Sequence, residues 1–217
     1  MLDVARRVKS FFDKCNIIKY CSLTNAMKAL TPQQIEKALK VASESKRNHA
    51  MILLAFKHGM RASEICDLRM SDVNLKTNEI IVHRMKGSLT NTQTLFNETG
   101  NPLMSELRVL KAWLAERESW EQESDYLFLS QKGGSMSRVQ FFRIFQSVAE
   151  QAGIPADLRH PHALKHALGF SMVKQGVQMM IIKQALGHKS LQSTAVYTSA
   201  DDAMADKARR QTFADQF

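Results

Sequence analysis

The sequence has no apolar run that approaches the roughly 20 residues needed to cross a bilayer as a helix. Its first residues, MLDVARRVKSFFDKC, contain no apolar signal-peptide core ending in a small-residue cleavage site. Cys15, Cys21 and Cys66 are odd in number and have no metal-like spacing, so they indicate reduced thiols rather than a disulfide scaffold or a zinc site. These absences exclude a helical membrane protein and a disulfide-rich secreted domain, and they predict a cytoplasmic protein.

Acidic residues are also fewer than basic ones. The 217 residues include 30 Lys and Arg against 21 Asp and Glu, which gives a formal net charge of +9. This excess favours a polyanionic partner, because basic side chains that neutralise phosphates release condensed counterions. The charge alone separates nucleic acid from an anionic membrane surface only weakly.

Helical periodicity dominates the chain, and the predicted fold class is mainly α (α+β): a helical domain with a small antiparallel β-sheet. Thr31 and Pro32 are typical of a helix start, with Thr31 as N-cap and Pro32 in the first turn. A strand at 79–84 turns at 86–88 and returns at 91–96. Further helices are expected over about 47–58, 62–68, 105–118 and 137–151, and through the final third, which Gly176 and Gly187 interrupt.

The length fits one substantial domain with short appendages. We expect an N-terminal extension over 1–28, with a basic amphipathic helix at 3–20. The main domain is predicted to span 29–200, and residues 201–217 form a C-terminal tail with helical character. Met179–Ile182 are apolar and are expected to lie in the core.

Three stretches carry residues suited to chemistry. Arg61 follows a glycine in HGMRASEICDLRMSDV (58–73). His162 and Lys165 lie one helical turn apart in HPHALKHALGFSMVKQGV (160–177). His188 follows a glycine, and Tyr197 comes nine residues later, in LGHKSLQSTAVYT (186–198).

In this order and spacing, the three stretches resemble the tyrosine recombinase (phage integrase) family over roughly residues 30–200. That family's pattern is an arginine, a hairpin lysine, His-x-x-Arg, Gly-His and a nucleophilic tyrosine. The spacing in HGMRASEIC and the stretch LSQKGGSMSR (129–138) look most like the small fimbrial phase-variation invertases. The resemblance implies the family's catalytic-domain fold. It also implies a site-specific recombinase that joins DNA through a 3′-phosphotyrosyl bond, with Tyr197 as nucleophile.

The resemblance also implies partners. The family acts on double-stranded DNA at short specific sites and brings two sites together with four subunits, the C-terminal segment often docking on a neighbour. Packing of the tail in cis is equally compatible with the sequence. Without a large N-terminal domain, we expect weak DNA binding by a monomer or help from an accessory DNA-bending protein.

The chemistry itself asks for these residue types. A phosphodiester repels nucleophiles, and its transition state places more charge on the non-bridging oxygens, so fixed cationic donors such as Arg61 stabilise it. Tyr197 needs its proton drawn off, and His162 and His188 can accept it or donate to phosphate oxygens. Lys86, on the hairpin turn, could protonate the departing 5′ hydroxyl. Because the phosphotyrosyl bond conserves the energy of the phosphodiester, no metal or nucleotide cofactor is required.

Lys165 departs from the family pattern, which has an arginine there. Lysine keeps the charge but loses the bidentate fork, and loss of one well-placed donor costs on the order of 3 kcal/mol of transition-state stabilisation. The enzyme is then slow or differently tuned, or the change is engineered, or the domain is a DNA-binding transcriptional regulator that keeps the fold without strand transfer. Besides the recombinase and the regulator, a type IB topoisomerase-like enzyme is a third possible function, and it shares the same chemistry.

Two further sets of residues are candidates for binding. A helix after Gly133-Gly134 carries candidates for groove and phosphate contact, for which a solvated face is an equally good interpretation: Arg138, Gln140 and Arg143. His160, His162 and His166 invite a metal interpretation, but HALKH lacks the glutamate of the zinc-protease motif and no further ligand is signalled nearby. We therefore expect no metal site.

Overall fold

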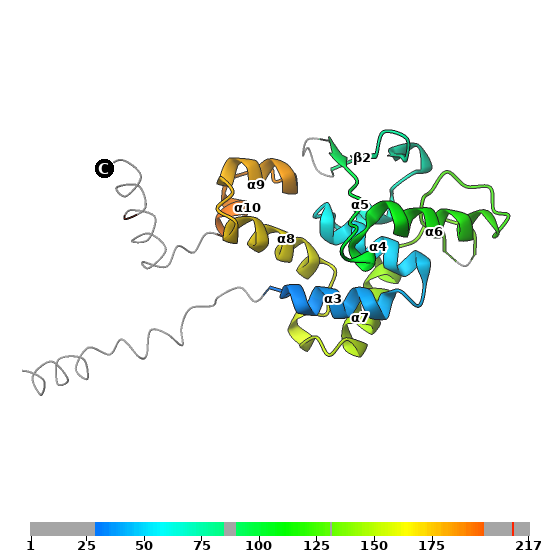
Figure 1. The fold of residues 1–217 in the computed structure, drawn as a ribbon, viewed down its shortest axis with the longest axis horizontal. Coiled ribbons are helices and arrows are strands. Elements are labelled where there is room, and N and C mark those ends of the chain that lie inside the picture. The colour runs from blue at the N-terminus through cyan, green and yellow to red at the C-terminus, as the bar shows by residue number, and fades with distance from the viewer. Residues whose placement is uncertain (1–28, 85–89, 131, 198–209, 211–217) are drawn as a thin grey trace, which may run out of the picture.

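The computed structural model describes residues 29–84, 90–130, 132–197 and 210. Over these ranges the protein is mainly helical with one small antiparallel sheet, as predicted (Figure 1). None of the described helices is long and apolar enough to cross a membrane. The expected helix at 3–20, the turn at 86–88 and nearly all of the tail at 201–217 lie outside the described residues.

The first described helices begin and end at residues that cap them. Helix α3 (Pro32–Ala42) starts where Thr31 and Pro32 predicted. The hydroxyl of Thr31 accepts from the amide of Gln34 (3.2 Å), and the Gln34 side chain accepts from the amide of Thr31 (2.9 Å). This capping box satisfies two otherwise unpaired donors. Helices α4 (Lys46–Lys57) and α5 (Ala62–Cys66) follow.

The sheet is a short meander beside the helices. Strand β1 (Val73–Asn74) follows the 3₁₀ turn η1 (Met70–Asp72) and pairs with β2 (Glu79–Val82), which pairs in turn with β3 (Asn91–Thr94). Val82 lies opposite Asn91, so β2 and β3 form a hairpin, and Lys86, between them in the sequence, lies outside the described residues. The buried faces of Ile80 and Val82 attach the hairpin to the core.

Two long helices, α6 (Glu106–Glu118) and α7 (Arg138–Gln151), carry the middle of the chain. The 3₁₀ turn η2 (Pro102–Met104) precedes α6, and η3 (Ala156–Leu158) follows α7. Gly133, at φ +85°, makes the turn between Leu129 and Ser135 that leads into α7. A left-handed backbone of this kind favours glycine.

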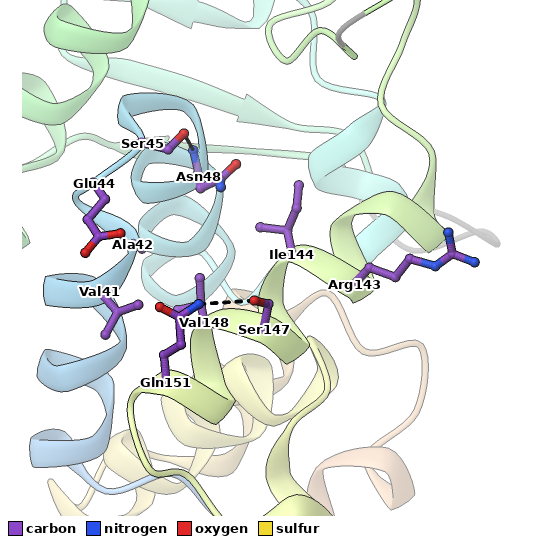
Figure 2. Close-up of a pocket in the computed structure, with 10 residues that line it drawn as sticks. All are labelled: Val41, Ala42, Glu44, Ser45, Asn48, Arg143, Ile144, Ser147, Val148 and Gln151. Atoms are coloured by element: carbon purple, nitrogen blue, oxygen red, sulfur yellow. Dashed lines mark hydrogen bonds between the residues drawn. The ribbon is translucent and has the colours of Figure 1, made fainter.

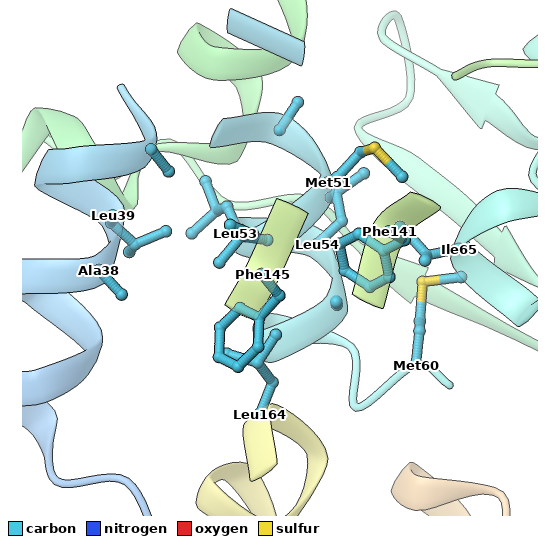
Figure 3. Packing of buried hydrophobic residues seen from close by; sticks show 14 of the residues in the cluster. Ala38, Leu39, Met51, Leu53, Leu54, Met60, Ile65, Phe141, Phe145 and Leu164 are labelled. Carbon is cyan, nitrogen blue, oxygen red and sulfur yellow. The ribbon is translucent and has the colours of Figure 1, made fainter. Parts of the chain in front are cut away.

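Helix α4 is the centre of the core. Its residues 49–55 are all buried, and α3, α5, α6 and α8 pack against it. Figure 3 shows Phe141 and Phe145 of α7 lying beside Leu53 and Leu54 of α4. Because α4 leads directly into α5, this packing fixes the position from which Arg61 projects.

The final third is helical, as predicted, and consists of α8 (His162–Lys174), α9 (Met179–Leu186) and α10 (Gln192–Ala195). A second, smaller apolar cluster joins them around Ile182, Leu186 and Tyr197. The prediction that Met179–Ile182 lie in the core is wrong for two of the four residues. Met180 is 58% exposed and Ile181 54% exposed, because α9 turns only one narrow face toward α8.

Replacing Phe145 with alanine is expected to lower the free energy of unfolding by about 3–5 kcal/mol, because a fully buried ring leaves a cavity. Val139, on the same helix and 50% exposed, supplies the control: Val139→Ala should change stability by less than about 0.5 kcal/mol. Urea unfolding followed by circular dichroism measures both. Equal losses would contradict the placement of α7.

Candidate active site

Arg61 is held at the start of α5 by the buried carboxylate of Glu64. Its backbone amide donates to Glu64 Oε2 (2.9 Å), and its Nη1 donates to Oε1 (2.5 Å). The Glu64 side chain is completely buried, whereas that of Arg61 is 34% exposed. Arg61 is therefore a cation anchored from behind, and it borders an open cavity that His160 and His162 also line.

Glu64 is a residue that sequence reasoning missed. Burial alone would raise the pKa of its carboxyl, but the hydrogen bonds from Arg61 and the charges of Arg84 and Lys165 outweigh burial, so the pKa is lowered. The carboxylate is therefore ionised and binds both Arg61 and the buried Arg84 (3.1 Å to its Nη1). Its spacing three residues after Arg61, as in a capping box, is the signal that could have found it.

Lys165 lies in α8 with only 1% of its surface exposed. Its Nζ donates to the carbonyl of Leu186, the last residue of α9, at 2.5 Å. Burial, together with the charges of Arg84 and Arg61, lowers the pKa of Lys165 to about 7, and Glu64 only partly opposes them. The lysine thus lies within the cluster of cations, but in this structure its ammonium binds the protein's own backbone.

His162 and His188 approach the cluster from two sides. His162 is exposed, and burial of part of its ring, then the charges of Lys165, His160 and Arg61, lower its pKa. His188 follows Gly187, which ends α9 in the left-handed conformation at φ +61°. Its Nδ1 lies 3.0 Å from the Thr194 hydroxyl, and burial, then Lys165 and Arg61, lower its pKa to about 4. His188 is consequently neutral at pH 7.

Tyr197 is buried, with 3% of its surface exposed. Its ring stacks on His188 at a centroid distance of 6.0 Å and contacts Phe170 edge-on at 5.3 Å. A Cβ at Gly169 would lie 2.8 Å from the ring carbon Cζ, so the absence of a side chain there makes room for the phenol. Burial raises the pKa of Tyr197 to about 12, although the charge of Arg61 opposes the change.

His166 is the second residue of the site that sequence reasoning missed, since the sequence suggests it only as a metal ligand. Its Nδ1 lies 3.1 Å from the hydroxyl of Tyr197, and its ring meets His162 edge-on at a centroid distance of 4.4 Å. Burial, then the charges of His162 and His160, lower its pKa to about 4, so its ring is neutral at pH 7 and can accept a hydrogen bond from the phenol. Across the described ranges, no three His, Cys, Asp or Glu side chains converge to hold a metal ion.

The three predicted DNA-contact residues of α7 have different surroundings. Arg138 lines the same cavity as Arg61 and His162, together with the exposed Val139 and Phe142. Gln140 has a local role, because its side-chain oxygen accepts from the amide of Ser137 (2.8 Å) in the capping box of α7. Arg143 borders a separate pocket between α7 and the α3–α4 corner, where its side chain points away from Val41 and Gln151 (Figure 2).

Five of the six predicted catalytic residues are thus brought together from α5, α8 and the segment after α9: Arg61, His162, Lys165, His188 and Tyr197. The sixth, Lys86, lies outside the described residues. An anchored guanidinium, a buried lysine and neutral imidazoles around a phenol are groups that suit the transfer of a phosphoryl group to a tyrosine.

Comparison with known proteins gives the family. The sequence pattern of the phage integrase family matches residues 28–204. The type 1 fimbriae regulatory protein FimB of Escherichia coli K12 is 39% identical over 176 residues, which cover 79% of this chain and 84% of FimB. FimE of the same strain is 32% identical over 174 residues, covering 79% and 83%. The chain belongs to the phage integrase family, the tyrosine site-specific recombinases.

Solved structures agree on the fold. The crystal structure of XerA recombinase superposes with a TM-score of 0.71 at 26% identity, covering 85% of this chain and 65% of that one. XerH recombinase bound to its difH substrate gives a TM-score of 0.69 at 23% identity, covering 86% and 55%. The predicted fold class, family and enzyme class, a DNA strand transferase, are confirmed.

The pocket beneath Tyr197 can be tested by chemical modification. In Gly169→Ala the added methyl would collide with the ring, so Tyr197 should be displaced outward and react faster with tetranitromethane. Mass spectrometry of the Tyr197 peptide measures nitration, and the partly exposed Tyr126 serves as the reference within the same chain. Unchanged nitration of Tyr197 relative to Tyr126 would contradict the close approach of Gly169.

Proposed function

We propose that this tyrosine recombinase cuts DNA by attack of Tyr197 on a phosphodiester held by Arg61, His162, Lys165 and His188. The observation that carries the proposal is the position of the Tyr197 phenol. It lies against His166 and His188 and within the field of Arg61, in a chain of the phage integrase family. No finding favours the alternative of a regulator without strand transfer.

In the proposed reaction, the oxygen of Tyr197 bonds to phosphorus while its hydroxyl proton passes to one of the neutral histidines beside it, His166 or His188. The bond from phosphorus to the 5′ oxygen breaks, and that oxygen takes a proton from Lys86, the donor that the sequence predicts. Arg61 and the ammonium of Lys165 stabilise the charge on the non-bridging oxygens. The 5′ hydroxyl of a second strand then attacks the phosphotyrosyl bond and releases Tyr197.

Lys165 sets the expected speed of this reaction. Its ammonium would have to leave the Leu186 carbonyl in order to bind a phosphate oxygen. It also lacks the planar pair of donors with which an arginine binds two oxygens at once. Its lowered pKa also means that the charged form is not fully populated near pH 7. We therefore expect slower cleavage than an arginine at this position would allow.

Double-stranded DNA as the partner is supported by the net charge of +9 and by XerH, which was solved bound to difH DNA. We propose that Arg138, which lines the same cavity as Arg61, contacts DNA next to the scissile phosphate, and that Arg143 contacts it farther along α7. We propose short specific sites, four subunits per synapse, an accessory DNA-bending protein and action in the cytoplasm. We also propose that residues 29–200 form the catalytic domain, flanked by the 1–28 extension and the 201–217 tail.

The first test is a covalent trap. The binding site is first identified by selecting bound duplexes from a random DNA library. A duplex with this site is then made with a nick beside the cleavage position, so that the short cleaved end diffuses away and the covalent adduct accumulates. We expect a protease-sensitive protein–DNA adduct with the unsubstituted protein and none with Tyr197→Phe. Tyr126→Phe is the control and should still form it. Sequence-specific binding without an adduct, even in Lys165→Arg, would overturn the proposal in favour of a regulator.

The pH dependence of cleavage tests the role of Lys165. Only its protonated form stabilises the transition state, so the single-turnover rate should fall as pH rises through its pKa. That pKa is about 7 in the free protein, and a bound phosphate raises it. Arginine stays charged, so Lys165→Arg should remove this fall between about pH 7 and about pH 9. The same fall in both proteins would show that another group titrates.

A further inference from the structure

Arg84 is a buried cation that neither the sequence pattern nor the proposed chemistry uses. It follows strand β2 by two residues, and its side chain has no exposed surface. Its Nη1 donates to the carbonyl of Gly59 (3.0 Å) and to Glu64 Oε2 (3.1 Å). Its Nη2 donates to the carbonyls of His58 and Ala185, both at 2.8 Å. One guanidinium therefore binds four acceptors.

These acceptors belong to three segments that are distant in the sequence. His58 and Gly59 follow the end of α4, Glu64 lies in α5, and Ala185 lies in the last turn of α9. Each segment leads to a reacting side chain. Arg61 comes two residues after Gly59 and is itself held by Glu64, and His188 comes three residues after Ala185.

The side chain of Arg84 also supports the turn before His188. A Cβ at Gly187 would lie 2.7 Å from Cδ and 2.8 Å from Cγ of Arg84, so the backbone of this turn rests directly on the arginine. Lys165 donates to the neighbouring carbonyl of Leu186. Two cations thus bind successive carbonyls at the end of α9, the end where the helix dipole is negative. They fix the direction in which the chain leaves the helix toward His188.

Stability alone does not explain this arrangement. Removing two charges from water is costly, and well-packed apolar residues in place of a buried ion pair are often as stable or more so. Arg84 Nε is buried and, among the described residues, has no hydrogen-bond partner, so the burial is not fully compensated. What an apolar side chain could not do is hold four acceptors from three segments at fixed distances.

We propose that Arg84 is a positioning residue for strand transfer. It orients Arg61 through Glu64, and it orients His188 through Gly187 and the end of α9. This role rests on the proposed function, because it matters only if Arg61 and His188 act on a phosphate. Arg84 itself does not touch the DNA.

The conservative variant separates charge from geometry. Arg84→Lys keeps the positive charge beside Glu64, but a single ammonium cannot reproduce the planar fork that reaches Gly59, His58 and Ala185 together. We expect the single-turnover cleavage rate at saturating protein to fall on the order of tenfold to a hundredfold, as misplacement by about 1 Å can do. The Kd for the selected DNA site should be nearly unchanged.

Arg117→Met is the matched control. Arg117 also donates to backbone carbonyls, those of Ser124 and Tyr126, but it does so from α6 and toward the loop after it. Its loss should lower the melting temperature while leaving cleavage at saturation unchanged.

A modified DNA substrate distinguishes a positioning defect from a general loss of stability. A methylphosphonate at the scissile position lacks one charged non-bridging oxygen, so its cleavage depends less on a well-placed cation. If Arg84 positions Arg61, the rate ratio of unsubstituted protein to Arg84→Lys should be much smaller on this substrate than on the phosphodiester. If Arg84 only stabilises the fold, the ratio will be the same on both.

The outcomes separate this inference from the function on which it rests. Absence of an adduct with the unsubstituted protein counts against the proposed function itself. A normal adduct with an equal cleavage rate in Arg84→Lys overturns the positioning role alone, as does an equal rate ratio on the two substrates. A reduced rate that the methylphosphonate largely restores, with Kd and Arg117→Met behaving as expected, supports it.

Discussion

The ion pair between Arg84 and Glu64 lies where the parts of the chain that carry the reacting groups meet. Neither side chain has exposed surface, and the acceptors around Arg84 come from the turn after α4, from α5 and from α9. A charge buried without its partner is strongly destabilising, so each member requires the other in place. This requirement links the end of β2, from which Arg84 extends, to both sides of the site.

The site has more positive charge than its own acids can balance. Burial and neighbouring cations lower the pKa of Lys165, His166 and His188, and the buried Glu64 opposes the change only at Lys165. This cluster of basic side chains therefore keeps an excess of positive charge unless an anion binds. A phosphate in the cavity beside Arg61 would supply the missing negative charge, so the free energy that the fold gives up here is recovered when DNA binds.

Much of the fold could be predicted from the sequence because its signals are local. Thr31 and Pro32 mark a helix start, and the spacing of apolar residues marks α4, α6 and α7, all of which the structure confirms. Met180 and Ile181 were misplaced because an apolar run does not reveal how wide a face its helix buries. That width depends on how α9 meets α8, which is a tertiary property.

The same distinction between local signals and tertiary contacts applies to the candidate site. Arg61, His162, Lys165, His188 and Tyr197 stand in a spacing that could be read along the chain, and the structure gathers them. Arg84 and His166 could not be assigned their contacts, because their partners lie 101 and 31 residues away. The role of Lys86 remains a prediction. The hydrogen bond from Lys165 to the Leu186 carbonyl depends on how α8 packs against α9, which no sequence motif encodes.

The pocket that Gly169 leaves for Tyr197 has a consequence for how cutting relates to binding. The phenol packs among Phe170, His166 and His188, so any movement of its oxygen toward a phosphate would give up some of these contacts. A DNA duplex that does not offset that loss would be bound and released uncut. Discrimination between DNA sequences would then be sharper in cutting than in binding, and the protein would occupy more sites than it recombines.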